Sequence, residues 1–241
     1  MSQRYDPGQA LISIHVPRTG GNSVRMCLEN WFGPRGFYTH YVDEAVGGAP
    51  ERHVLGPGNC VHGHFNKYRG YGVRDYYPEC RQWIIFLRDP FEQHVSLFFY
   101  LRRNEGMQFF SGRAVPGSAW KGFGDFLQFM SDNRDVLQTS FANTFLAHLP
   151  VDHERASADE ILSQFIHVGI TEELGASLRL LAAKLERSEL EMPRVNSAER
   201  DLVVDERLRE RHEEMFAVEH AIFGAARARH AREIVSSSGS I

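Results

Sequence analysis

Short apolar runs alternate along this chain with stretches in which apolar residues recur at helical spacing. The apolar runs predict buried strands, and residues 82–87 (QWIIFL) form the clearest of them. Gly63 weakens one of the others, because a glycine inside a strand has no side chain to pack. The predicted strands are residues 11–16, 59–64, 82–87 and 166–170.

Two of the predicted helices begin with cap sequences. Asp89 suits an N-cap and Pro90 the first helical position, whereas Ser157 and Glu160 have the spacing of a capping box. Residues 33–58 are rich in Gly and Pro and predict mainly loop, and residues 103–124 predict a long loop or lid. The predicted helices are residues 23–32, 90–103, 125–130, 136–148, 157–165, 172–186 and 205–234.

Strands that alternate with helices predict an α/β protein, with a mainly parallel sheet covered by helices on both faces. Ligands of such sheets bind beyond the carboxyl ends of the strands. No internal repeat or domain boundary is apparent, so we expect residues 1–235 to form one domain. Residues 236–241 (SSSGSI) are polar and small, and we expect a frayed tail there.

The formal net charge of the 241-residue chain is −4, which argues against a nucleic-acid partner. Neither a signal-peptide pattern nor the roughly 20 consecutive apolar residues of a membrane span are present. Cys27, Cys60 and Cys80 match neither metal-ligand nor disulfide-framework spacing, so we expect free thiols. These features predict a soluble protein of the cytoplasm.

Residues 17–23 (PRTGGNS) lie between a predicted strand and a predicted helix. The two glycines allow the backbone to approach an anion, Thr19 and Ser23 offer hydroxyl groups, and Arg18 supplies a permanent positive charge. The segment therefore fits an anion site, although an ordinary turn would have a similar composition. It is not a Walker A loop, because the GK[ST] ending is missing.

A second motif follows the strand at residues 82–87. Arg88 stands where this strand ends, and Ser96 lies about two turns into the next helix. An arginine at that edge can pair bidentately with a phosphate, and a helical hydroxyl can join it. Alternatively, Arg88 pairs with a carboxylate and Ser96 has no part in binding.

A third motif is His62-Gly63-His64. On a strand, both imidazoles would point to the same face, and Gly63 would leave room for a close neighbour. One interpretation is a general base with a helper. A second is a metal pair with His15 as third ligand, and a third is two hydrogen-bonded histidines without a chemical role.

In this order, PRTGGNS, HGHF and RDPFEQHVSLFFY resemble the motifs of family-2 sulfotransferases of the heparan-sulfate 2-O-sulfotransferase type. In that family the first loop reads near PKTGGTS and the later segment near RDPxERxxSxYxY. Weaker similarity continues through residues 138–146, 167–185 and 196–197. The chain thus resembles a soluble, bacterial-type member, and the resemblance implies the P-loop-like sulfotransferase fold.

The resemblance also implies the chemistry. The donor would be 3′-phosphoadenosine 5′-phosphosulfate (PAPS), and the product would be adenosine 3′,5′-bisphosphate. His64, helped by His62, would deprotonate a hydroxyl acceptor, with Arg18 on the leaving-group side and no metal. Arg88 and Ser96 would hold the 3′-phosphate. The residues that would hold the 5′-phosphosulfate are Arg18, Thr19, Gly20, Gly21, Asn22 and Ser23.

Two positions depart from the family pattern. Arg18 stands where lysine is usual, and Asn22 stands where threonine is usual. Arginine keeps the charge but changes its shape and hydrogen-bond geometry. Three other functions compete: a P-loop kinase, a non-catalytic nucleotide-binding module, and a metal hydrolase built on His15, His62 and His64.

The acceptor is not named by the sequence and is either a small molecule or a glycan. More than half of the chain's aromatic residues fall between residues 62 and 126, a segment with only a small surplus of Lys and Arg. A polyanionic glycan would need a denser basic track. We therefore expect a small or weakly charged hydroxyl acceptor that enters near the loop at residues 103–124.

Overall fold

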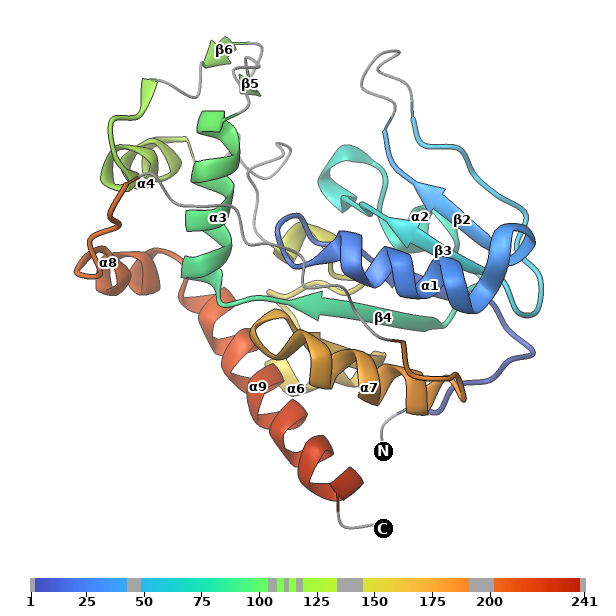
Figure 1. Cartoon of the computed structure of the whole chain (residues 1–241). Coiled ribbons are helices and arrows are strands. Elements are labelled where there is room, and N and C mark those ends of the chain that lie inside the picture. Colours follow the sequence, from blue (N-terminus) through green and yellow to red (C-terminus); the bar gives the residue numbers. More distant parts are fainter. Residues whose placement is uncertain are drawn as a thin grey trace.

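The computed structural model describes residues 3–42, 49–103, 108–110, 113–115, 119–133, 145–190 and 202–238. At its centre is a parallel sheet of five strands in the order β2-β3-β1-β4-β7 (Figure 1). The strands are β1 (Leu11–Ile14), β2 (Phe37–His40), β3 (Cys60–Gly63), β4 (Gln82–Leu87) and β7 (Phe165–Ile170). The predicted α/β class with a parallel sheet is confirmed.

The central strands are buried on both faces, as expected of a parallel sheet covered by helices. On β1, Ile12 and Ile14 belong to one apolar cluster, whereas Leu11 belongs to the cluster on the opposite face. The same alternation on β4 places Trp83 and Ile85 on the Ile12 side of the sheet. One side chain in two therefore faces each helical layer.

Helices α1 (Gly21–Gly36) and α7 (Leu174–Lys184) pack on the Leu11 face of the sheet. Helices α6 (Ala158–Ser163) and α9 (Ala217–Ser238) cover the Ile12 face. Helix α6 starts with the predicted capping box, in which Ser157 accepts from the backbone of Glu160 and Glu160 reaches back. These layers leave the carboxyl ends of the strands open to the elements that follow them.

A second helical unit stands beside those strand ends. Helix α3 (Pro90–Arg103) packs with α4 (Phe123–Asp132) and α8 (Leu208–Met215) around a separate, aromatic-rich core (Figure 1). Many aromatics of the segment 62–126 are therefore core residues rather than ligand contacts. The fully or nearly buried ones include Phe65, Tyr77, Phe91, Phe98, Trp120 and Phe126.

Short elements complete the described chain. A two-stranded hairpin of β5 (Gln108–Phe110) and β6 (Arg113–Val115) follows α3, in the stretch predicted as a long loop. The others are α2 (Val73–Tyr76), η1 (Lys67–Arg69), η3 (Phe145–His148) and η4 (Thr171–Glu173). Among the helices that the structure describes, none has the length and apolar character needed to cross a membrane.

Several predicted boundaries were wrong. The segment 33–58 contains the edge strand β2, and α1 runs from Gly21 to Gly36 across a break at Gly33. The predicted helix 205–234 is two helices, α8 and α9, and α9 continues to Ser238. The first three residues of the predicted tail are therefore helical. The predicted helix 136–148 lies outside the described residues up to position 144, and the rest of it is the 3₁₀ helix η3.

All three cysteines are buried and free, as the sequence predicted. Burial raises the pKa of the Cys27 and Cys80 thiols to about 11 and raises that of Cys60 further. Since the thiolate is the reactive form, these cysteines are chemically quiet packing residues.

Candidate active site

The glycine-containing loop between β1 and α1 takes a conformation that few residues adopt. Arg18 and Gly20 both have positive φ, 67° and 79°. This is common for glycine but strained for arginine, and such strain occurs most often at functional sites. At the start of α1, the N–H groups of Gly21 and Asn22 have no acceptor inside the helix and can bind an anion.

Two hydrogen bonds from other elements fix this loop. Gln93 of α3 donates from Nε2 to the carbonyl of Pro17 at 3.0 Å. The hydroxyl of Thr171 lies 2.9 Å from the carbonyl of Thr19 and 3.0 Å from that of Leu87, the last residue of β4. Neither Gln93 nor Thr171 was predicted, because both act on backbone atoms from far along the chain.

The polar side chains of the loop differ in how far solvent or a ligand can reach them. Thr19 is buried, and its hydroxyl donates to the carbonyl of Val16 at 2.8 Å, so in this conformation it braces the turn. Ser23 is also buried, whereas Asn22 is exposed. In this conformation the side chain of Asn22 is therefore accessible to a ligand, whereas the side chains of Thr19 and Ser23 are not.

Arg18 reaches across to α3. Its Nε donates to the hydroxyl of Ser96 at 3.2 Å, and its guanidinium lies 4.8 Å from the centre of the Tyr100 ring. Tyr100 is one turn further along the helix than Ser96, so the two side chains hold the guanidinium together. The structure therefore joins the first and second sequence motifs through one side chain.

Arg88 lies on the other side of the loop backbone. It donates from Nη1 to the carbonyl of Arg18 at 3.3 Å. Its guanidinium also lies 3.8 Å from a carboxylate oxygen of Glu92 and 3.9 Å from one of Glu172. Arg88 therefore lies near two carboxylates, as the alternative interpretation of the sequence expected, although these distances are long for a strong ion pair. Burial, and then the nearby Arg88, lower the pKa of Arg18.

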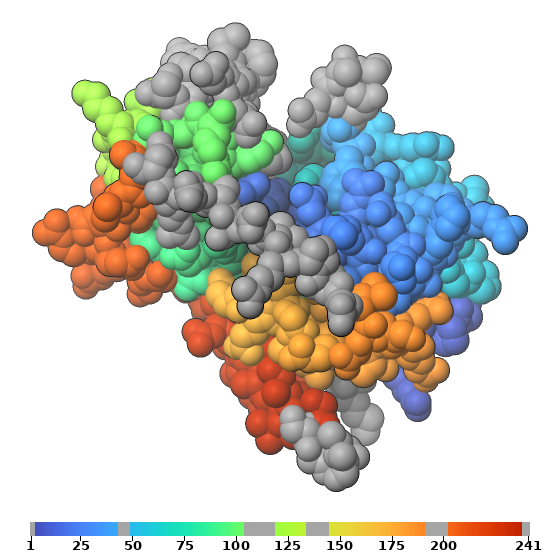
Figure 2. Space-filling model, viewed as in Figure 1, coloured from blue at the N-terminus to red at the C-terminus, as the bar shows by residue number. Residues whose placement is uncertain are grey.

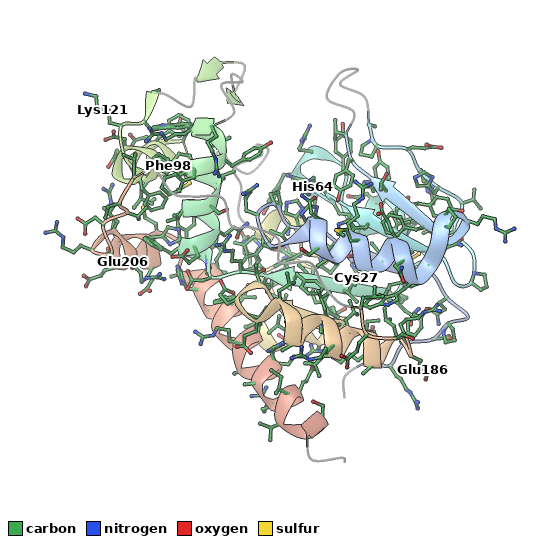
Figure 3. All side chains as sticks on the ribbon, in the orientation of Figure 1. Cys27, His64, Phe98, Lys121, Glu186 and Glu206 are labelled. Carbon is green, nitrogen blue, oxygen red and sulfur yellow. The ribbon has the colours of Figure 1, made fainter. Side chains whose placement is uncertain are left out.

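His64 extends from the carboxyl end of β3, above the start of α1 (Figure 3). Its Nδ1 lies 2.7 Å from the carbonyl oxygen of His15. Because a carbonyl only accepts, Nδ1 carries the proton, and the lone pair of neutral His64 is on Nε2. Burial lowers the pKa of His64, so the imidazole is neutral near pH 7 and can accept a proton.

His62 lies deeper in the same site. It is 1% exposed, and its Nδ1 lies 2.8 Å from the hydroxyl of Ser13 on β1. Burial is the main reason that its pKa falls to about 3. The ring of His15 stacks on that of His62 and separates it from His64.

The three histidines form a stack. The His15 ring lies between the other two, with centroids 5.0 Å from His62 and 4.4 Å from His64. Stacked rings direct their nitrogens sideways rather than toward one common point, which is unsuited to a tetrahedral metal site. Among the residues that the structure describes, no group of three or more His, Cys, Asp or Glu side chains is placed to hold a metal ion.

Two glycines in the motifs are explained by this packing. A Cβ on Gly21 would lie 1.8 Å from Nε2 of His15, and a Cβ on Gly63 would lie 1.9 Å from the carbonyl oxygen of His40. The close neighbour that Gly63 admits is therefore the edge strand β2. Because Gly21 has no Cβ, the ring of His15 can pack directly against the start of α1.

Two further site residues were missed by the sequence interpretation. The hydroxyl of Tyr41, just after β2, lies 2.9 Å from Nδ1 of His15. The ring of His148, in η3, is 6.1 Å from that of His64, and its buried Nδ1 has no hydrogen-bond partner among the described residues. Tyr41 follows a strand that was predicted as loop, and nothing in the sequence links His148 to the HGH motif.

In Figure 2 the β1–α1 loop lies between α3 and the region of β2 and β3. A separate pocket of about 400 Å³ lies to the side, lined by Lys67, Arg74 and Asp152 among others. None of the predicted site residues lines that pocket. The chemistry of the loop and the histidine stack, rather than the pocket, defines the candidate active site.

No protein-family model matches the chain, and no curated protein matches it. Among solved structures, the crystal structure of mouse sulfotransferase SULT7A1 complexed with PAP is similar over 99% of this chain and 91% of that chain. The two sequences are 13% identical, and the TM-score is 0.49. A similarity this distant does not assign a function.

Proposed function

We propose that this protein transfers the sulfuryl group of PAPS to a hydroxyl acceptor. The observation that carries the proposal is the hydrogen bond from Arg18 to Ser96. This bond joins the first and second sequence motifs, which resemble the nucleotide-binding segments of family-2 sulfotransferases. Both motifs lie at the carboxyl edge of the sheet, where α/β proteins bind ligands. His64, from the third motif, stands at the same edge.

The nucleotide would be held at two anion positions. Backbone N–H groups of Gly21 and Asn22 and the Arg18 guanidinium would bind the 5′-phosphosulfate, while Arg88 and Ser96 would bind the 3′-phosphate. Positive charge is concentrated at these two positions: after burial, the nearby Arg88 and Arg103 guanidinium groups lower the pKa of Arg18. A phosphate bound among these side chains would offset the repulsion between them.

The reaction would be an in-line transfer. The acceptor oxygen forms a bond to sulfur, and the bond from sulfur to the 5′-phosphate oxygen breaks. The acceptor proton passes to Nε2 of His64, and the negative charge that grows on the leaving phosphate is stabilised by Arg18 and by the loop N–H groups. The products are a sulfate ester and adenosine 3′,5′-bisphosphate.

The direct test uses PAPS labelled with sulfur-35 and a panel of hydroxyl acceptors. We expect labelled acceptor to form in step with adenosine 3′,5′-bisphosphate, and no phosphorylated acceptor to form with ATP and magnesium. Phosphoryl transfer from ATP would instead identify a kinase. Tight nucleotide binding without turnover on any acceptor would identify a non-catalytic nucleotide-binding module.

The proposed acceptor class follows from the small surplus of Lys and Arg in the segment 62–126. We propose a small or weakly charged hydroxyl compound, although the aromatic enrichment no longer supports this, since many of those rings are core residues. The acceptor panel is assayed at low and high salt. A highly sulfated polysaccharide as best substrate, with activity collapsing as salt rises, would contradict the proposal.

A further inference from the structure

His15 is the most contacted histidine of the site, although the reaction above gives it no task. Its ring stacks on His64 at 4.4 Å and 26° on one side and on His62 at 5.0 Å and 16° on the other. A Cβ on Gly21 would collide with its Nε2. The ring thus fills the space between the start of α1 and the proposed base.

The backbone of His15 contacts the same partner motif. Its carbonyl accepts the Nδ1–H of His64 at 2.7 Å, and its amide donates to the carbonyl of Gly63 at 2.8 Å. One residue therefore fixes both the tautomer of His64, through its carbonyl, and the plane of the imidazole, through its ring. The backbone contacts survive any change of side chain, so the two effects can be separated experimentally.

Tyr41, which directly follows the edge strand β2, contacts both His15 and His64. Its hydroxyl lies 2.9 Å from Nδ1 of His15, and its ring meets His64 edge-on at 4.9 Å and 80°. Burial raises the pKa of Tyr41, so its hydroxyl stays protonated. The ring of His15 is therefore held by contacts with Tyr41, His62 and Gly21, and its other face stacks on His64.

We infer that His15 is a positioning residue, which holds His64 in one ring orientation and couples it to the glycine loop. This inference rests on the proposed function only for its kinetic consequence, because the orientation of His64 can be observed without turnover. Gly21, at the start of α1, lies directly against the ring of His15, and His15 stacks on His64. A shift of the glycine loop on nucleotide binding would therefore pass through His15 to the base.

The test compares His15→Ala with His15→Phe. The alanine variant removes the ring, whereas the phenylalanine variant keeps a flat ring for stacking and loses only the bond to Tyr41. Tyr41→Phe removes the same bond from the other side and serves as the matched control. Each protein is labelled with ¹³C,¹⁵N-histidine, so that NMR reports the tautomer of His64 from its ring nitrogens and its ring orientation from ring-current shifts and nuclear Overhauser contacts, and the thermal midpoint verifies folding.

For the wild type we expect one His64 tautomer, protonated at Nδ1, and a change in its signals on addition of adenosine 3′,5′-bisphosphate. His15→Ala should keep this tautomer, because the backbone carbonyl of residue 15 remains. Without the stacked ring, it should change the orientation of the His64 ring, weaken the response to nucleotide, and lower the rate of sulfuryl transfer about 10²-fold, the size of effect that about 1 Å of misplacement can have. Nucleotide affinity should be little changed. His15→Phe and Tyr41→Phe, which keep the stacked rings, should keep most of the rate and the wild-type orientation of the His64 ring.

An unchanged ring orientation of His64, nucleotide response and transfer rate in folded His15→Ala would overturn the inference while leaving the sulfotransferase proposal intact. If His15→Ala fails to fold, His15→Phe decides: a changed orientation of the His64 ring there would contradict positioning by ring stacking. Normal NMR behaviour of the series, with no sulfuryl transfer by the wild type on any acceptor, would overturn the proposed function and not the positioning of His64.

Discussion

Nε of Arg18 donates to the hydroxyl of Ser96 across 3.2 Å, although the two residues are 78 positions apart in the chain. The bond links the loop after β1 to the helix after β4, the strand next to β1 in the sheet. Neighbouring parallel strands bring their carboxyl ends to one edge, so residues that follow each strand meet there. The proposed nucleotide site is formed where the loop after β1 and the helix after β4 come together.

The contacts of Ser96 and Arg88 predict selectivity for a 3′-phosphate. We expect adenosine 3′,5′-bisphosphate to bind more than tenfold tighter than 5′-AMP, since a charge-assisted contact contributes about 1.5–3 kcal/mol. Arg88→Ala should remove most of this preference, and Ser96→Ala a smaller part. Isothermal calorimetry measures both ligands, and equal affinities for the wild type would contradict the assignment of the 3′-phosphate site.

Tyr100 should contribute to nucleotide affinity through Arg18. Because its ring lies 4.8 Å from the guanidinium, Tyr100→Leu removes a cation–π contact of about 0.5–1 kcal/mol and should weaken binding of adenosine 3′,5′-bisphosphate about two- to fivefold. Tyr100→Phe keeps the ring and should bind like the wild type. A loss of equal size in both variants would show that the hydroxyl, not the ring, matters.

His64→Ala should separate catalysis from binding. Turnover should fall by roughly 10²–10⁴-fold, the usual range for a positioned general base, while affinity for adenosine 3′,5′-bisphosphate stays the same. His53→Ala is the control, because His53 stacks on Tyr38 outside the histidine stack. Wild-type turnover in the His64 variant would remove this residue from the mechanism. Loss of wild-type activity with chelators would revive the metal interpretation.

The pH dependence of the rate offers a second test of His64. The base acts in its neutral form, and burial lowers its pKa below the usual value of about 6.5. The neutral form therefore persists as pH falls, and the acid limb of the rate profile should have its midpoint below about pH 6.5. Single-turnover rates between pH 5 and 8 measure this limb, and a midpoint above about 7 would contradict a buried neutral base.

His167, on β7, should make stability dependent on pH. Both ring nitrogens are buried without a partner among the described residues, and burial is the main cause that lowers the pKa well below its usual value. Native His167 stays neutral, whereas the unfolded chain binds a proton below about pH 6.5. The free energy of unfolding therefore decreases as the pH is lowered below about 6.5, and this residue contributes about 1.4 kcal/mol per pH unit to the decrease.

His167→Leu should raise the free energy of unfolding at pH 7, because an unpaired buried polar group costs about 1–3 kcal/mol, and should raise it more at pH 5.5. His230→Leu is the matched control, since His230 is also buried but has its Nε2 2.8 Å from the hydroxyl of Ser177. That variant should be destabilised at pH 7. Urea unfolding at both pH values measures the difference, and a destabilised His167→Leu would contradict this account.

The sequence by itself determined the α/β class, the buried strands and the residues that stand at their carboxyl ends. These are local properties: the apolar run of β4 and the capping box at Ser157 depend on neighbouring residues, and both are present as predicted. The edge strand β2 was missed because its residues FYTH lie among glycines and prolines, and only pairing with β3 makes them a strand.

Only the tertiary structure decided how the candidate site is assembled. The sequence placed Thr19 among the ligand-binding hydroxyls, yet the turn directs its hydroxyl to the carbonyl of Val16. It placed His62 beside His64 on one face, yet β1 inserts the ring of His15 between the two imidazoles. Sequence spacing fixes which face of a strand a residue occupies, but the neighbouring strand, 4.7–4.9 Å away in sheets generally, determines what that face contacts.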